Sequence, residues 1–337
     1  MKSIIIQFNK IDVVSGSVIM ALGIFSLGAM QQIPLIGQYS KTITLFLFLL
    51  WFLMIISFVT TFINHSYRKL LISIPVKSFA IGTWIAGTSV ICVLMVHEYQ
   101  QLQIIIECIS IFNLFAWFAY ILFCISQFKR IVVHNLGRDV HGVILLSTVS
   151  TQSMVCLLIN VFHGEVSNKM VIFFIVAGFA FYLFSMILIL MRFIQKWGSI
   201  HELKNTDCII HGALSITGLA MTQSQVFSSE FLNCFWFFVL ALFILIETFE
   251  VVRAVARVKL FGLKKALFTY DVSQWSRNFT FGMLYYFTYN LVTLYEGKMP
   301  WTFQLQFLEL FAWVVLILLL MEVILFFQSK INALLLK

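Results

Sequence analysis

Long apolar stretches separated by short polar links occupy nearly the whole chain. A helix needs roughly 20 mostly apolar residues to cross the hydrocarbon core of a bilayer. Ten stretches meet that requirement, at about 12–34, 41–64, 76–97, 100–128, 141–162, 169–194, 207–225, 227–252, 272–295 and 302–328. Because the links are too short for a soluble module, the pattern predicts a single polytopic, all-α membrane domain over residues 1–337 with ten transmembrane helices.

The stretches differ in composition according to whether their number along the chain is odd or even. Odd stretches are rich in small and hydroxyl-bearing residues, as in "HGALSITGLAMTQS", and even ones carry large apolar residues, as in "CFWFFVLALFILI". In a bilayer, small residues allow close helix approach, and polar side chains are tolerated where they face protein or water. The alternation predicts a helical hairpin repeated five times, with odd helices in an inner ring and even helices in an outer ring. A bundle that uses small residues only for packing is the alternative.

Composition and charge fit a membrane protein and indicate its orientation. The chain is 61% hydrophobic and 11% charged, with a mean hydropathy of +0.99, whereas soluble domains carry about 25% charged residues. With a cytoplasmic N-terminus, the outside links hold only Lys41, Lys169 and Lys298, so the positive-inside rule places both termini in the cytoplasm. The net charge of +8 follows from this bias, and no basic soluble face is available for a nucleic acid.

Motifs of catalysis and metal binding are absent from the sequence. The six cysteines lie inside the predicted spans without a C-x-x-C pair, which is typical of small buried hydrophobic residues. No H-E-x-x-H, G-x-S-x-G or D-x-D-like pattern occurs. We therefore expect no enzyme activity, no metal site and no cofactor.

Five short fragments, one in each odd stretch, resemble a known family. "MALGIFS" (Met20–Ser26), "IAGTSV" (Ile85–Val90) and "VSTQS" (Val149–Ser153) are similar to its first, third and fifth helices. "IIHGALSITGLA" (Ile209–Ala220) and "WSRNFTFGM", followed by "TYNL", are similar to its seventh and ninth. On these fragments the chain resembles the tellurite-resistance/dicarboxylate transporter (TDT) family, which includes the slow-type anion channels of plant guard cells.

The resemblance implies both a fold and a function. It implies ten helices in five hairpins with quasi-fivefold symmetry, a pore lined by the odd helices, and a homotrimer in the cell (plasma) membrane, here a bacterial inner membrane. It implies a gated anion channel or passive transporter for small inorganic or organic anions, blocked by a phenylalanine of the ninth helix. The alternative is a proton-coupled exporter of sulfite, a C4-dicarboxylate or an oxyanion such as tellurite. Such coupling usually needs an ionisable relay, and the odd stretches offer little of one, which favours the channel.

The resemblance also assigns candidate residues to the gate and the pore. Aligning Trp275 with the family tryptophan places Phe279 at the gate position, four residues later on the same helix face. Relatives with phenylalanine directly before glycine favour Phe281 instead, which lies about 200° away, so only one of the two can block the pore. We favour Phe279. The expected pore-lining residues are Gly16, Met20, Gly23, Gly87, Thr151, Gly212, Thr217, Trp275, Gly282 and Met283.

The sequence departs from the family at the prolines that kink the inner helices. Its only prolines are Pro34, Pro75 and Pro300, all at span ends, and Ser147 and Thr280 stand where relatives often carry proline. Without the proline ring each inner helix keeps its hydrogen-bond ladder, so the resemblance does not determine the width of the pore.

Three basic or titratable residues are expected at the cytoplasmic mouth. Arg277 has no counterpart in the family pattern, and a charge inside a membrane is usually paired or functional. Arg277 either forms a structural ion pair with Glu247 and Glu250 or attracts anions at the mouth. His141 and His211 begin the fifth and seventh stretches, where they either add positive potential when protonated or have no special role.

Overall fold

The computed structural model describes residues 11–162, 165–195, 202–294 and 302–335, and every regular element in these ranges is a helix. The long helices are α1 (Gly16–Leu27), α3 (Ser40–Ile63), α6 (Gly82–Glu98), α7 (Gln103–Val133), α8 (Leu146–Val161), α9 (Asn168–Ile194), α10 (Ile209–Ser224), α11 (Ser229–Phe261), α13 (Trp275–Leu294) and α14 (Thr302–Leu335). The short ones, in the links, are α2 (Pro34–Gly37), α4 (His65–Ser73), α5 (Pro75–Ser78) and α12 (Leu263–Leu267). The all-α prediction is confirmed for the described residues.

Eight helical segments are long and apolar enough to cross a bilayer, which supports a multi-pass membrane protein. They are Val13–Gln32, Ser40–Ile63, Pro75–Glu98, Gln100–Val133, Gly142–Val161, Asn168–Ile194, Ser229–Phe261 and Phe303–Leu335. Two predicted spans, α10 and α13, are not among them: α10 has 16 residues, and α13 carries Arg277, Asn278 and Asn290. The count of ten spans therefore remains a prediction.

Buried and exposed helices alternate along the chain. Within their most apolar windows, Pro75–Glu98 and Gly142–Val161 are each 94% buried, against 17% for Ser40–Ile63 and 22% for Ser229–Phe261. Most residues of α1, α10 and α13 are buried as well. The exposed side chains of the other long helices are mainly large and apolar, as expected of surfaces that face lipid. The two classes of stretch seen in the sequence thus correspond to burial in the structure.

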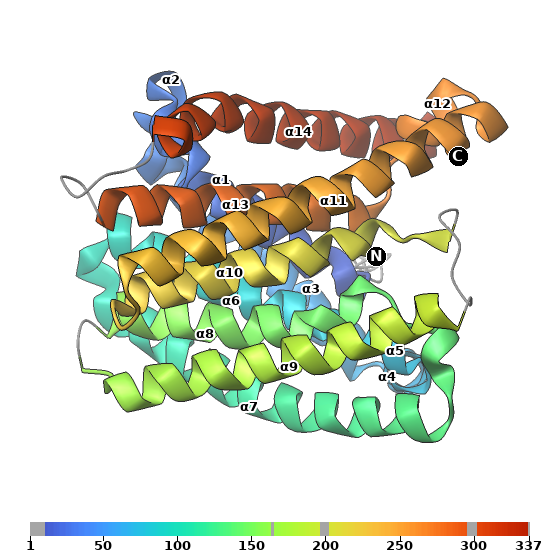
Figure 1. The fold of residues 1–337 in the computed structure, drawn as a ribbon, viewed down its shortest axis with the longest axis horizontal. Coiled ribbons are helices and arrows are strands. Elements are labelled where there is room, and N and C mark those ends of the chain that lie inside the picture. The colour runs from blue at the N-terminus through green and yellow to red at the C-terminus, as the bar shows by residue number, and fades with distance from the viewer. Residues whose placement is uncertain (1–10, 163–164, 196–201, 295–301, 336–337) are drawn as a thin grey trace, which may run out of the picture.

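The five buried helices pack in a closed ring. Helix α1 contacts α6, α6 contacts α8, α8 contacts α10, α10 contacts α13, and α13 returns to α1. The exposed helices lie against this helix ring: α3 on α1 and α6, α7 on α6 and α8, α9 on α8 and α10, α11 on α10, and α14 on α13 and α1. Figure 1 shows the long helices side by side along the long axis of the molecule.

Each buried helix is preceded by a 3-10 turn, and the five turns also contact one another in a closed circle. They are Val13–Ser15, Phe79–Ile81, Gly142–Leu145, Asn205–Cys208 and Val272–Gln274. Side chains of Asp12, His141 and Asp271 cap three of them by accepting a hydrogen bond from the backbone N–H two residues later. Helices α4, α5 and α12 lie at the same end of the molecule, on the right in Figure 1.

Candidate functional site

A cavity lies at the end of the helix ring where the five 3-10 turns meet. Its volume is about 400 Å3, and residues from the start of every buried helix line it. Its charged side chains are Lys77, Lys204, Arg253, Arg257 and Asp271. Lys77 pairs with Asp12 and Arg253 pairs with Glu250, and of the charged side chains that line the cavity four are basic and one is acidic. We call this cavity the basic vestibule.

His141 lines the basic vestibule and carries no charge near neutral pH. Its Nδ1 accepts a hydrogen bond from the Val143 N–H at 3.5 Å and lies 2.8 Å from the Thr206 Oγ1. Burial lowers the pKa of His141 to about 4, and the positive charges of Lys204 and Arg192 act in the same direction. The histidine therefore adds no positive potential to the vestibule at neutral pH.

Asp207 joins the starts of α8 and α10. Its Oδ1 accepts a hydrogen bond from the Gly142 N–H at 2.7 Å, and its Oδ2 accepts one from the Lys204 N–H at 2.8 Å. A Cβ on Gly142 would come within 2.8 Å of the Asp207 Cα, so glycine permits this close approach. Burial raises the pKa of Asp207, and the two N–H donors oppose that rise. Sequence reasoning missed this residue, although an acid three residues after a helix start is one signal of a capping box.

The middle of the helix ring is closed by packed side chains. Phe279 and Met20 each expose only 1% of their surface. A Cβ on Gly282 would come within 2.7 Å of the Ile24 Cγ2, which shows how closely α13 lies against α1. Side chains therefore fill this layer of the ring.

A second cavity, the central cavity, lies inside the helix ring. Its volume is about 20 Å3, enough for about one water molecule. All five buried helices line it, through Ile24, Ser89, Ser153, Ile216 and Met283 among others. On α13 and its preceding turn, Ser273 lines the basic vestibule and Met283 lines the central cavity. Phe279 lies between these two positions along the chain.

Phe281, the alternative gate residue, points toward the exposed helices. Its ring stacks on Phe311 of α14 with centroids 5.6 Å apart and meets Phe243 of α11 edge-on at 4.9 Å. Two residues turn a helix by about 200°. Because Phe281 points outward to α11 and α14, Phe279 points toward the interior of the helix ring. The gate role of Phe279 remains a prediction.

A chain of hydrogen bonds links four ring helices at the end opposite the vestibule. The Nε2 of His97 lies 3.2 Å from the Asn160 Oδ1. Asn160 donates from Nδ2 to the Gln223 Oε1 at 3.1 Å, and Gln223 donates from Nε2 to the Asn290 Oδ1 at 3.3 Å. These residues come from α6, α8, α10 and α13, and we call them the amide belt. Sequence reasoning missed it, although each member lies near the end of an odd stretch.

The glycines expected to line the pore lie where ring helices touch. A Cβ on Gly16 would come within 2.8 Å of the Thr83 carbonyl carbon, and one on Gly87 within 3.3 Å of the Gly16 carbonyl oxygen. In the same way Gly23 faces Val90, Gly212 faces Thr280 and Gly282 faces Ile24. These glycines let the helices approach closely, and a pore-lining role for them remains a prediction.

The other expected pore residues have different surroundings. Met283 lines the central cavity, and Met20 is buried in the packed layer. Thr151 accepts a hydrogen bond at 3.2 Å from a tryptophan of α7 and so faces an exposed helix. Trp275 donates to a tyrosine hydroxyl of the preceding link at 3.2 Å. The hydroxyl of Thr217 donates to a carbonyl of its own helix at 2.7 Å.

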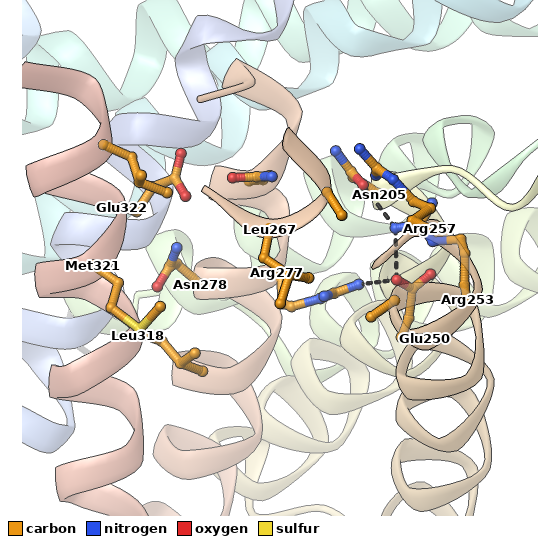
Figure 2. Close-up of a pocket in the computed structure, with 14 residues that line it drawn as sticks. Asn205, Glu250, Arg253, Arg257, Leu267, Arg277, Asn278, Leu318, Met321 and Glu322 are labelled. Carbon is orange, nitrogen blue, oxygen red and sulfur yellow. Dashed lines mark hydrogen bonds and ion pairs between the residues drawn. The ribbon is translucent and has the colours of Figure 1, made fainter. Parts of the chain in front are cut away.

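Arg277 belongs to a partly buried ion-pair network between α13 and α11 (Figure 2). It pairs with Glu250, and its Nε lies 3.8 Å from the Glu247 Oε2. Glu250 also pairs with Arg253 at 2.6 Å, and Glu247 Oε1 lies 3.5 Å from the Nε2 of His211. The ion-pair alternative for Arg277 is the one observed. Neither Arg277 nor His211 is among the described residues that line the basic vestibule, whereas both were expected at the mouth.

No protein-family model matches the chain, and no curated protein sequence matches it significantly. The resemblance to the TDT family therefore rests on the five sequence fragments alone.

Proposed function

We propose that this chain is a gated anion channel, or passive transporter, for small inorganic or organic anions. In this proposal it is a relative of the TDT family that crosses the cell membrane ten times, in five hairpins with quasi-fivefold symmetry, and assembles as a homotrimer. Both termini lie in the cytoplasm, the helix ring encloses the pore, and Phe279 is the gate.

The order of the two cavities along the helix ring is the observation that carries the proposal. Ser273 lines the basic vestibule, the buried Phe279 follows it along the chain, and Met283 lines the central cavity. The described residues that line the central cavity carry no charge. A basic entrance concentrates anions. An uncharged constriction binds them only weakly, and weak binding is what conduction requires.

An aromatic ring at Phe279 suits a gate on physical grounds. A bulky apolar side chain in a narrow passage excludes water and gives an ion no substitute for its hydration shell, so the closed state does not conduct. A rotamer change that moves the ring aside would open a path from the basic vestibule to the central cavity.

The proposed count of ten spans requires α10 and α13 to cross the bilayer despite their polar residues. Their polar side chains have partners inside the protein, since Gln223 belongs to the amide belt and Arg277 to the ion-pair network. A helix surrounded by protein does not need the apolar composition of one that faces lipid. This packing supports ten spans.

Anion flux through reconstituted protein tests the gate. Currents and fluxes of chloride, nitrate, sulfite and malate are measured in proteoliposomes that contain wild type, Phe279→Ala or Phe281→Ala. We expect Phe279→Ala to raise anion current at least about tenfold, because it removes a barrier of about 1.4 kcal/mol or more. Phe281→Ala removes a ring of equal size that faces α11 and α14, and it should leave the current near the wild-type level. If only Phe281→Ala raises the current, then Phe281 is the gate and the assignment to Phe279 is wrong.

One observation favours the proton-coupled alternative. His211 and Glu247 lie 3.5 Å apart inside the molecule, and a buried histidine–carboxylate pair is a common element of proton relays in transporters. Saturable, proton-dependent flux without current, lost in His211→Gln, would replace the channel by a coupled exporter. Current that persists in His211→Gln would exclude this pair from the mechanism.

A further inference from the structure

A polar pocket lies next to the basic vestibule, with which it shares Asn205, Arg253 and Arg257. Its volume is about 170 Å3, and residues of α11, α12, α13 and α14 line it. Figure 2 shows Glu322 and Asn278 on one side and Glu250 and Arg253 on the other, with Arg277 directed toward Glu250. The two sides of the pocket therefore differ: Glu250 is ion-paired on one side, whereas Glu322 on the other side has no ion pair with a described residue.

Two oxygen atoms on the α14 side of the pocket have no hydrogen-bond partner in the described chain. Glu322 and Asn278 expose 5% and 6% of their surface, and both the Glu322 Oε1 and the Asn278 Oδ1 accept no hydrogen bond. Glu322 also forms no ion pair with any described residue. A buried carboxylate without a counter-charge is strongly unfavourable.

The other buried acids of the described chain are compensated. Glu250 pairs with Arg253 and Arg277, and Asp207 accepts two backbone hydrogen bonds. Glu322 is the exception among them. Either a proton on Glu322 or a cationic group from outside the described chain can balance it.

The unpartnered atoms indicate the chemistry of that group. An ammonium group has one positive charge and three N–H donors, so it offers enough donors for both Glu322 and Asn278. A hard divalent ion takes about six or more oxygen ligands, whereas this wall offers one free carboxylate. Across the pocket, Arg257 forms no ion pair with a described residue and can hold an anionic group such as a phosphate.

We propose that this pocket binds a phosphoethanolamine group, with the ammonium on Glu322 and Asn278 and the phosphate at Arg257. Helices α11 and α14 border the pocket, and their exposed faces carry large apolar residues such as Phe249 and Ile324. An aminophospholipid of the surrounding bilayer can therefore supply the group, and soluble phosphoethanolamine is the other source. Arg257 also lines the basic vestibule, but the binding test below does not measure anion conduction.

Thermal unfolding in two lipids tests the site. Wild-type protein is placed in nanodiscs that contain either phosphatidylethanolamine or phosphatidylcholine with the same acyl chains. The choline headgroup keeps the positive charge and the phosphate but has no N–H donor, so it is a matched control. We expect phosphatidylethanolamine to raise the Tm by about 2 °C or more above phosphatidylcholine. Equal Tm values would overturn the proposal.

Variants on α14 assign the effect to one carboxylate. Glu322→Gln removes the charge and keeps the shape, so the difference between the lipids should disappear. Glu309→Gln changes an exposed acid of the same helix and should keep the difference. If Glu322→Gln does not fold, Glu322→Asp withdraws the carboxylate by one methylene and should reduce the difference. A full difference in a Glu322 variant would overturn the site.

Two further measurements identify the occupant. Soluble phosphoethanolamine and phosphocholine are added to the protein in detergent. A rise in Tm with phosphoethanolamine alone supports the site with a soluble source, and an effect seen only with the lipid supports it with a membrane source. Infrared spectra of wild type and Glu322→Gln can contradict the proposal by showing whether Glu322 is protonated. A protonated carboxylic acid band that belongs to Glu322 and does not change with phosphatidylethanolamine would mean that a proton occupies the site.

Discussion

The two ends of the helix ring are built from different chemistry. At one end, charged side chains and five 3-10 turns surround the basic vestibule. At the other, the amide belt joins four helices through neutral amides and one imidazole, without an acid, lysine or arginine. Charge attracts an ion from a distance, whereas amide hydrogen bonds act only on contact. The vestibule end can therefore attract ions over a distance, whereas the amide belt acts only on groups in contact with it. Variants at each end can test this difference.

The largest stability effect is expected at the vestibule end, from Asp207. Asp207→Asn keeps the shape but replaces one acceptor oxygen by a donor, so either the Gly142 or the Lys204 N–H loses its partner. The free energy of unfolding should fall by about 2–3 kcal/mol, measured by denaturant titration in detergent. Asp139→Asn, an exposed acid nearby, is the control. Equal losses in both variants would show that the two hydrogen bonds do not hold the helices together.

A smaller loss is expected at the amide belt. Gln223→Leu leaves the Asn160 Nδ2 and the Asn290 Oδ1 without their partners in the belt. Both groups are half-buried and water can replace part of the loss, so unfolding should become easier by about 1–2 kcal/mol. The same titration measures it, with the exposed Gln101→Leu as the control. A loss as large as that of Asp207→Asn would remove the difference between the two ends.

Acid sensitivity should also arise at the vestibule end. The pKa of His141 is lowered from 6.5 to about 4, so the unfolded chain binds the proton more readily and stability falls as the pH drops through this interval. His141→Asn keeps an acceptor for the Val143 N–H but does not titrate. The wild type should lose stability between about pH 7 and pH 5, and in His141→Asn this loss should be smaller by about 1 kcal/mol. The effect is no larger because water screens the exposed part of the histidine ring. Tm values at both pH values measure this, and an unchanged loss would place the acid sensitivity elsewhere.

The smallest effect is expected from a single vestibule charge. Lys204→Gln should reduce anion flux about twofold at low ionic strength and much less at high ionic strength, because salt screens the attraction. Lys259→Gln, an exposed lysine of α11 that does not line the vestibule, is the control. Flux in proteoliposomes at two salt concentrations measures the effect. Equal reductions in both variants would show that the vestibule charge has no special role.

The sequence predicts which helices are buried, because helices that contact other helices on several sides carry small residues. The alternation of small and large residues separated the buried helices from the exposed ones, including α10 and α13, which apolar length alone does not select. The ion pair of Arg277 was also predictable as one of two alternatives, since an intramembrane arginine needs an acid and the preceding span carries two.

The direction of single side chains and the networks between helices could not be predicted in the same way. A helical wheel gives the angle between Phe279 and Phe281 but not which of them faces the ring. Contacts with Phe243 and Phe311, far away in the sequence, decide that. The amide belt was missed for a related reason: each member resembles an interfacial polar residue until the closed ring brings the four helices together.

The placement of Arg277 has a consequence for the biosynthesis of the chain. An arginine opposes insertion by about 2.5–3.5 kcal/mol at the centre of an isolated membrane helix, and by less near a helix end, where Arg277 lies. Helix α11, with Glu247 and Glu250, is synthesised before α13, so both acids are already made when the arginine emerges from the ribosome. A chain that lacks these acids would present α13 to the insertion machinery without its partners. The order of the two helices along the chain thus allows α13 to enter the membrane against a partner already in place.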